Sequence, residues 1–398
     1  MNMTVVLLSL CQALLTTGNV LLISVNALIG QQLSPSPELI TLPIAMQFVG
    51  LMCATIPASL IMARVGRKNG FYLGNSIGIA GALCCILALQ LGSFFLFCGG
   101  TFLLGIGIGF GTLYRFAAVE ACAAEHKSRA ISLVMAGGVI AAVLGPNLAI
   151  SSRSWLDDSV FSGAFIGLLL LYVVALVLLS FVRLANGDGS THEVKTSRPI
   201  SEIVLQPVFI VAVTVGMVGY AVMNLIMTVT PVAMARCGFE FSTAAWVIEW
   251  HVLGMFLPSF ITPRLISRLG LLSVMLLGAV LMLLCILLNL HGVSEWHFWG
   301  ALLLLGVGWN FMFISATQLV TSTYKPAEKS KSQAANEFLV FGVVTISAFS
   351  SGWLESVLGW QMLNTLMIPV LAWAVLVIMV FRKAVERHLA LPSAVTRH

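Results

Sequence analysis

The chain has 398 residues, of which 59% are hydrophobic and only 9% are charged. Soluble domains are about 25% charged, so this composition excludes a soluble enzyme with a large core and indicates a polytopic membrane protein. The net charge of +5 does not indicate nucleic-acid binding, because the basic residues lie in loops between apolar segments.

Apolar runs of about 20 residues, the length that a bilayer-spanning helix requires, recur along nearly the whole chain. The first run is too long for a signal peptide and lacks a basic start, so we expect it to be the first span. We predict twelve spans, which are residues 4–29, 39–63, 70–92, 95–119, 129–151, 160–183, 207–235, 243–265, 271–291, 297–322, 332–355 and 360–382. The predicted fold class is therefore an all-α polytopic membrane protein.

One long hydrophilic segment divides the spans six and six. It runs from about Asn186 to Ser201 and contains the sequence NGDGSTHEVKTSRP. We therefore expect an N-terminal six-helix bundle over residues 1–185 and a cytoplasmic linker over 186–206. A C-terminal six-helix bundle with a cytoplasmic tail would follow over residues 207–398.

Basic residues mark alternate loops. Arg and Lys gather after the second, fourth, eighth and tenth predicted spans, in the central segment and in the C-terminal tail. Cytoplasmic loops of membrane proteins are enriched in Lys and Arg, so we expect both termini to be cytoplasmic. The turn that contains Cys237 then faces outward.

The two halves of the sequence repeat with a shift of 204 residues, which aligns Arg64-Val65-Gly66 with Arg268-Leu269-Gly270. Two six-helix halves in the same orientation, each with basic loops, resemble the major facilitator superfamily, although Ala63 replaces the usual Asp of its second-loop signature. The resemblance implies two six-helix pseudo-repeats with a substrate site near mid-membrane between them. We expect a monomer in the lipid bilayer that works by alternating access.

Polar side chains deep in a span are functional candidates, because burying them in a membrane is costly. His251 lies about a third of the way through the eighth predicted span, and the repeat places Gln47 opposite it. The other candidates for gating or coupling are Arg115, Glu120 and Glu337. A structural ion pair would account for these charged residues equally well.

Two pairs of residues, each four apart, stand out in the seventh and eighth spans. Met223 and Met227 share one helix face, and so do His251 and Met255. Thioether and imidazole groups suit copper, and thioether favours Cu(I). Met234 and Cys237 lie further outward and form a candidate entry path. Ordinary packing is the alternative, since the chain contains 17 Met residues.

These M-x-x-x-M and H-x-x-x-M motifs lie in the contexts NLIMTVTPVAMARCG and WHVLGMFLPSF. Together with YRFAAVE and SRAISLVMAGG, they resemble the CcoA-like copper importers of the major facilitator superfamily, over essentially the whole chain. The resemblance implies copper import across a bacterial inner membrane, to supply a cbb3-type cytochrome oxidase. Copper would be the cargo, not a cofactor, and its ligands would be Met223, Met227, His251 and Met255. Copper chaperones or a P-type ATPase would be downstream partners.

Riboflavin importers of the same fold are the main alternative. A flavin carrier needs aromatic stacking and amide hydrogen bonds, which could come from Trp246, Trp250, Trp309, Asn310 and Gln47. A drug or metabolite exporter and a non-transporting membrane receptor are further alternatives. Nothing in the sequence resembles a nucleophile triad, a phosphate-binding loop or an ATP site, so we expect neither an enzyme nor direct ATP coupling.

Overall fold

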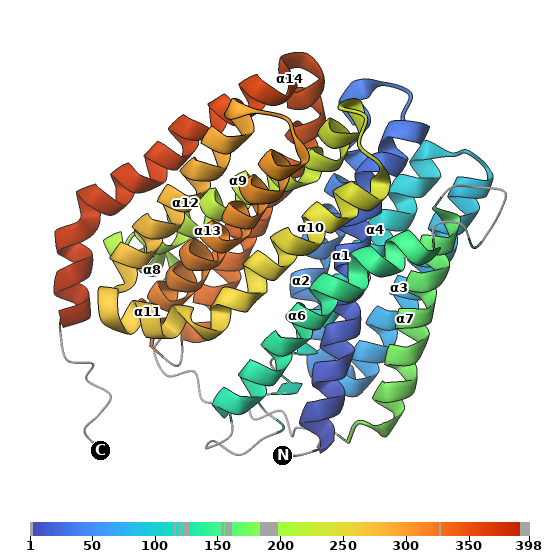
Figure 1. Cartoon of the computed structure of the whole chain (residues 1–398). Coiled ribbons are helices and arrows are strands. Elements are labelled where there is room, and N and C mark those ends of the chain that lie inside the picture. Colours follow the sequence, from blue (N-terminus) through green and yellow to red (C-terminus); the bar gives the residue numbers. More distant parts are fainter. Residues whose placement is uncertain are drawn as a thin grey trace.

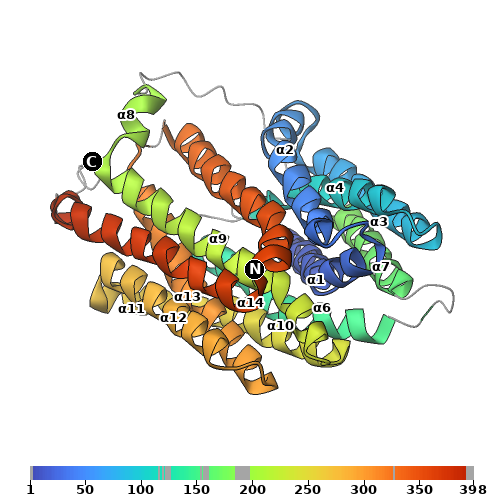
Figure 2. The ribbon, with the colours of Figure 1, turned by 90° about the horizontal axis from the view of Figure 1, so that it is seen from above.

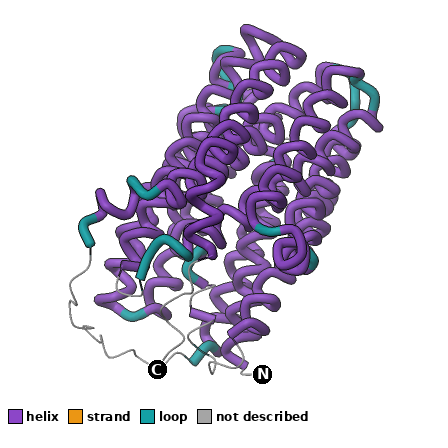
Figure 3. Tube along the Cα trace, turned by 90° about the vertical axis from the view of Figure 1, so that its left-hand side faces the viewer, coloured by secondary structure: helices purple, strands orange, loops and turns teal. Residues whose placement is uncertain are grey.

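The computed structural model describes residues 3–114, 117–118, 121, 127–152, 155, 161–183, 198–325 and 328–390. These residues form helices joined by short loops, and none of them lies in a β-strand (Figure 3). The predicted all-α fold class is therefore confirmed.

The described N-terminal half, up to residue 183, has its own apolar core. Its helices are α1 (Met3–Leu33), α2 (Leu42–Val65), α3 (Arg67–Gln90), α4 (Phe94–Gly111), α6 (Lys127–Ser152) and α7 (Ser162–Phe181), and the short η1 (Pro37–Leu39) precedes α2. Leu22, Phe71 and Phe97 are fully buried in this core. The ring of Phe97 packs edge-on against that of Phe165, with centroids 5.5 Å apart.

The described C-terminal half, from residue 200, encloses a second core. Its helices are α8 (Ile200–Val204), α9 (Pro207–Arg236), α10 (Phe241–Phe256), η3 (Leu257–Phe260), α11 (Thr262–Leu269), α12 (Leu271–His291), α13 (Glu295–Thr321) and α14 (Lys329–Ala390). Figure 2 shows the two halves as separate groups of helices side by side. The expected boundaries at residues 185 and 206 stay predictions, since residues 184–197 lie outside the described part.

The structure departs in two places from the expectation of straight helices joined by loops. The predicted span 243–265 bends by 57° between α10 and α11, where Pro258 interrupts the regular α-helix. The predicted spans 332–355 and 360–382 form one element, α14, which turns at Gly359 with a φ of 73°. Glycine adopts positive φ readily, so the chain reverses there without a loop.

Among the described residues, nine helices are long and apolar enough to cross a membrane, or ten if α10 and α11 form one span. Of α6, only the stretch Gly137–Ser152 is included, as a shorter apolar helix, and the two arms of α14 count as one helix. The total of twelve spans therefore stays a prediction.

Glycine permits the closest helix crossings, at equivalent places in the two halves. A Cβ atom on Gly105 of α4 would lie 1.9 Å from the carbonyl oxygen of Gln47 on α2. A Cβ atom on Gly306 of α13 would lie 2.3 Å from the carbonyl oxygen of His251 on α10. Small residues let helix backbones approach closely in membranes. The sequence repeat pairs Gln47 with His251, and the carbonyl groups of these two residues face a glycine of a neighbouring helix in the same way in each half.

The two halves meet along two seams. The start of α1 and the end of α14 lie at one end of the molecule, which we call the terminal end, and the other end is the distal end (Figure 1). The first seam joins α2 to α14, and its buried side chains include Ile40, Ile44, Phe48, Val340 and Val344. The second seam joins α6 to α10, and its buried side chains include Val20, Ala141, Ala142, Ile248 and Val252.

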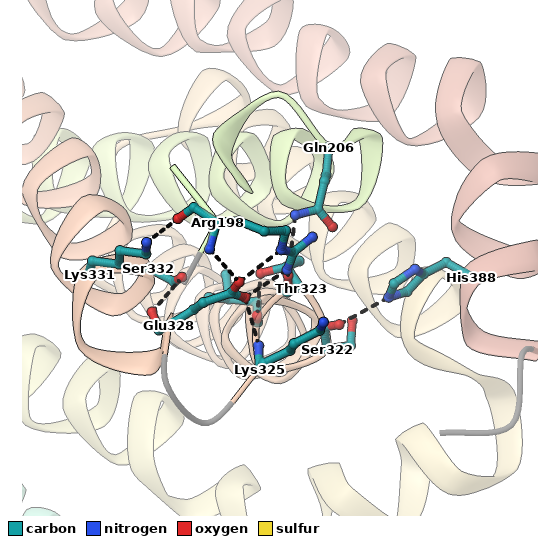
Figure 4. Close-up of polar contacts among 10 residues, drawn as sticks. Arg198, Gln206, Ser322, Thr323, Lys325, Glu328, Lys331, Ser332 and His388 are labelled. Carbon is teal, nitrogen blue, oxygen red and sulfur yellow. Dashed lines mark hydrogen bonds and ion pairs between the residues drawn. The ribbon is translucent and has the colours of Figure 1, made fainter. Parts of the chain in front are cut away.

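At the terminal end, Arg198 joins the segment before α8 to the turn between α13 and α14 (Figure 4). Its Nε and Nη2 atoms donate to the two carboxylate oxygens of Glu328 at 2.9 and 2.7 Å. The backbone amides of Arg198 and Lys325 also donate to this carboxylate, at 3.1 and 3.0 Å. The hydrogen bonds from Arg198 hold the pKa of the Glu328 carboxyl well below its usual range. We call this arrangement the Arg198 clasp.

Candidate functional site

The four predicted copper ligands are buried within the C-terminal half. The exposed fractions of Met223, Met227 and Met255 are 1%, 3% and 9%, and that of His251 is 0%. The three Met side chains belong to the same apolar core, which also contains Leu302 and Trp309. The structure thus brings α9 and α10 to one core, and none of the three Met side chains belongs to the buried hydrophobic cluster of either seam.

His251 has one satisfied and one unsatisfied ring nitrogen. Nδ1 lies 2.8 Å from the carbonyl oxygen of Leu302 on α13. A carbonyl only accepts, so Nδ1 carries the proton and Nε2 keeps the lone pair. Nε2 is buried and has no hydrogen-bond partner among the described residues. A lone pair of this kind can accept a metal ion or a hydrogen-bond donor.

The predicted entry path lies at the distal end of α9. Met234 is fully buried, whereas Cys237 is exposed in the turn that follows the helix. The Cys237 amide donates to the Met234 carbonyl at 3.1 Å, so the two residues are within one turn. A cavity of about 200 Å³ lies beside them between the halves, lined by Leu28, Gln31, Gln32, Phe161, Pro231, Ala235, Phe239, Glu240, Phe241 and Ala244. Neither Met234 nor Cys237 lines this cavity.

Gln47 is part of a chain of amides within the N-terminal half. Its Nε2 donates to Asn19 Oδ1 at 2.7 Å, and its Oε1 accepts from Asn26 Nδ2 at 3.1 Å. Asn26 Oδ1 is buried and has no hydrogen-bond partner among the described residues. Our sequence reasoning missed Asn19 and Asn26, although their spacing of seven residues places both on one face of α1.

The structure describes only one of the other three residues predicted for gating or coupling. Arg115 and Glu120 lie outside the described residues, and Glu337 is half-buried on α14. Our sequence reasoning also missed the ion pair between Arg236 of α9 and Glu355 of α14. Each of these two charges lies near the end of a predicted span, and only the fold shows that they meet.

Four aromatic side chains from three helices meet near the middle of the C-terminal half. Trp309 stacks on Phe313 with ring centroids 4.8 Å apart and an interplanar angle of 11°. Tyr220 packs edge-on against these two rings at 5.4 and 5.6 Å and lies 5.9 Å from Phe341. Tyr220 and Phe313 also pack against the α2–α14 seam. This group, which we call the aromatic cluster, therefore borders the N-terminal half.

Trp246, Trp250 and Asn310, which the flavin alternative also names, lie outside the aromatic cluster. Trp246 and Trp250 pack with Trp296 and Trp299 nearer the distal end of α10 and α13. Asn310 Nδ2 donates to the Met255 carbonyl at 2.6 Å and to Ser259 Oγ at 2.7 Å. Its Oδ1 accepts from Thr262 Oγ1 at 2.7 Å. These three bonds use the amide to hold the bend between α10 and α11.

Comparison with known proteins decides the family. The family model described as "Major Facilitator Superfamily" matches residues 8–348. The chain belongs to the major facilitator superfamily. This membership makes it a multi-pass membrane transporter and not an enzyme, as the sequence predicted.

Named relatives of this transporter cover most of its length. The "Riboflavin transporter RfnT" of Brucella anthropi is 40% identical over 371 residues, which are 92% of this chain and 93% of that protein. The "Uncharacterized MFS-type transporter YdeG" of Bacillus subtilis is 29% identical over 384 residues, which are 88% and 87% of the two chains. The first relative agrees with the riboflavin alternative, and neither name refers to copper.

Solved transporters share its fold at low sequence identity. The crystal structure of a D-xylose–proton symporter aligns with a TM-score of 0.75 at 14% identity, covering 94% of this chain and 96% of that chain. The crystal structure of the nucleoside transporter NupG aligns with a TM-score of 0.68 at 13% identity, covering 98% and 100%. At this identity the likeness shows the fold alone.

Proposed function

We propose that this transporter imports riboflavin, or a small molecule with the same planar ring system, by alternating access. The aromatic cluster carries the proposal. It offers stacked and edge-on rings from α9, α13 and α14, and it borders the N-terminal half. Planar heteroaromatic cargo is bound well by such rings, because stacking adds to the burial of apolar surface. The relation to a riboflavin transporter at 40% identity supports the proposal.

The N-terminal half would contribute hydrogen bonds to the same cargo. Asn26 has a buried carboxamide oxygen without a hydrogen-bond partner among the described residues. Buried polar groups are normally satisfied, so an unpaired acceptor suggests that a donor joins it in another state of the protein. The imide N–H of a flavin ring is a donor of this kind.

We propose copper as a second candidate cargo, on one specific observation. The buried Nε2 of His251 has no partner among the described residues, and it belongs to a helix whose Met255 shares a core with Met223 and Met227. Imidazole nitrogen and thioether sulfur together suit Cu(I). Copper would then pass Met234 and Cys237 and supply the assembly of a cbb3-type cytochrome oxidase through copper chaperones or a P-type ATPase.

Parallel uptake assays separate the two candidates. Cells with and without the protein are given radiolabelled riboflavin or radiolabelled copper, and accumulation is measured at equal protein amounts. Riboflavin accumulation that falls in Trp309→Leu cells supports the first proposal. Copper accumulation that is lost in His251→Asn cells supports the second. Accumulation of neither compound above the level of cells without the protein would overturn both.

We also propose that the protein is a monomer in a bacterial inner membrane, with both termini in the cytoplasm. The concentration of Lys and Arg in alternate loops supports this orientation. A fluorescent protein that matures only in the cytoplasm, fused after His398, should then fluoresce. In this orientation the terminal end faces the cytoplasm, and the distal end faces outward.

A further inference from the structure

Thr41 reaches across the α2–α14 seam near the distal end. It directly precedes α2, and its side chain is buried. Its Oγ1 donates to the carbonyl oxygen of Ala348 at 3.0 Å and accepts from the backbone amide of Gly352 at 2.9 Å. Residues 348 and 352 are four apart on α14, so their carbonyl and amide are each other's partners in a regular helix. One hydroxyl of the N-terminal half thus binds a carbonyl and an amide that are hydrogen-bonding partners within one helix of the C-terminal half.

Gly352 makes this approach possible. A Cβ atom at this position would lie 2.7 Å from Thr41 Oγ1, 3.2 Å from the backbone nitrogen of Thr41 and 3.3 Å from the carbonyl oxygen of Glu38. Backbone atoms cannot rotate away as a side chain can, so a larger residue would separate α14 from the start of α2. Glycine is required here because two segments of the backbone, the start of α2 and the middle of α14, approach each other closely.

The α14 side of this contact is held within its own half. Glu355, less than one turn beyond Gly352, is buried and forms an ion pair with Arg236 at the end of α9. The position of Gly352 is therefore tied to two helices of the C-terminal half. Thr41 is tied in turn to η1 and α2 of the other half.

The second seam carries a polar contact of its own. Asn147 Nδ2 of α6 donates to Glu249 Oε2 of α10 at 3.0 Å. Asn147 lies in the last turns of α6 and Glu249 in the middle of α10, and Figure 2 shows the α6–α10 pair on the other side of the molecule from α2. Described residues thus form hydrogen bonds between the halves on each seam, and both contacts lie towards the distal end.

We propose that the Thr41 hydroxyl is a latch that holds the distal end closed during the transport cycle. When the seam opens, the Ala348 carbonyl and the Gly352 amide can still pair with each other within α14. The Thr41 hydroxyl is then hydrated by water that enters the opening. Opening leaves no backbone group unsatisfied, so the latch can release and re-form repeatedly. This inference rests on the alternating access proposed above and is independent of the cargo.

Cysteine labelling tests the latch. Ile44 is buried on the same seam, one turn beyond Thr41, so Ile44→Cys reports opening of the distal end. The background carries Cys53→Ser and Cys237→Ser, which remove the exposed thiols of the described residues. A membrane-impermeant maleimide is applied to right-side-out vesicles, and the labelling rate is compared with that of the same background without Ile44→Cys.

Thr41→Val removes the hydroxyl at nearly constant shape and should raise the labelling rate about fivefold, the shift expected for the loss of one net hydrogen bond. Gly352→Ala should raise it as well, by pushing the two helices apart. Thr41→Ser keeps the hydroxyl and should label as slowly as the parent. Thr55→Val removes only a bond within α2, to the Leu51 carbonyl, and should also leave the rate unchanged.

Equal labelling rates for Thr41→Val, Gly352→Ala and Thr41→Ser would overturn the latch. If Thr41→Val reduces the amount of folded protein, Thr41→Ala, which also removes the hydroxyl, takes its place in the comparison with Thr41→Ser. The readout needs no cargo, so a negative riboflavin or copper assay leaves the result for the latch intact. Conversely, unchanged labelling beside normal uptake would overturn the latch and leave the proposed transport standing.

Discussion

The proton of His251 lies on Nδ1, which donates to the carbonyl oxygen of Leu302 at 2.8 Å. This contact leaves Nε2 as a buried lone pair without a partner among the described residues. The motif H-x-x-x-M shows only that His251 and Met255 share a helix face. The fold adds the tautomer, because it places the Leu302 carbonyl beside one of the two nitrogens.

A variant at His251 separates its two nitrogens. The Nδ2 atom of an asparagine can donate to Leu302 in place of Nδ1, but asparagine has no equivalent of Nε2. We expect His251→Asn to leave riboflavin uptake within about twofold of wild type, since His251 lies outside the aromatic cluster, and to abolish any copper uptake. His297→Asn, at a half-buried position near the start of α13, is the matched control and should change neither. A large fall in riboflavin uptake in His251→Asn at equal protein amount would place the histidine in the flavin site.

The stacked ring of Trp309 should contribute to cargo binding. We expect Trp309→Leu to raise the KM for riboflavin roughly threefold to tenfold, since aromatic pairs contribute about 0.5–1.5 kcal/mol beyond the area that they bury. Trp250→Leu removes a ring that packs against Trp246 and Trp299, outside the aromatic cluster, and should leave the KM unchanged. Initial uptake rates over a range of riboflavin concentrations give both values. Equal effects of the two substitutions would remove the aromatic cluster from the proposed site.

Asn310 should matter for stability more than for cargo. Its amide makes three hydrogen bonds that brace the bend between α10 and α11, so we expect Asn310→Ala to lower the free energy of unfolding by roughly 2–4 kcal/mol. The thermal unfolding midpoint of the purified protein in detergent measures this loss. Asn69→Ala, which removes one exposed bond to the Val65 carbonyl, should change the midpoint little. An unchanged midpoint in Asn310→Ala would mean that α13 does not brace the bend.

The Arg198 clasp should withstand mild acid. Because the pKa of Glu328 is lower in the folded protein than in the unfolded chain, the clasp contributes its full stability above the unfolded value, about 4.3. That contribution is lost only as the pH falls from there through the lower folded value. We expect hydrogen exchange at the amides of Arg198 and Lys325, corrected for the intrinsic rate, to be equally protected at pH 7 and pH 5.

Glu328→Ala removes the acceptor of both amides and should abolish their protection at each pH. Glu202→Ala removes a neighbouring carboxylate that is not part of these bonds and serves as the control. Loss of protection between pH 7 and pH 5 in the wild-type protein would show that Glu328 titrates in its ordinary range and would contradict the prediction.

The sequence predicted the positions of the helices well, because apolar length and alternate basic loops are local signals. Each predicted span has helical residues in the described chain. The bend at Pro258 and the reversal at Gly359 changed the expected shape, and α4 ends at Gly111, before the predicted end at residue 119. The spacing of four residues predicted that Met223 and Met227 share one face of their helix, and both side chains lie with Met255 in one apolar core. It could not show which side chains of other helices they meet, because the direction of a helix face depends on how the helices pack together.

The interactions that require two distant segments were out of reach of the sequence. Thr41 and Gly352 are more than three hundred residues apart, and neither belongs to a recognisable motif. Gln47 was singled out for its depth, but its partners Asn19 and Asn26 lie on another helix. Asn310 was assigned to a flavin because of its residue type, whereas the fold uses its amide to hold α10 and α11.

Trp309 and Asn310 are consecutive residues with different partners. The indole belongs to the aromatic cluster, while the amide next to it binds both arms of the bent α10–α11 pair. Helix α10 also carries Ile248 and Val252 of the α6–α10 seam. If cargo displaces the indole, as proposed above, one turn of α13 would pass that movement through the Asn310 amide to α10, which carries one side of the seam. Cargo recognition and movement of the halves would then both depend on the two consecutive residues Trp309 and Asn310.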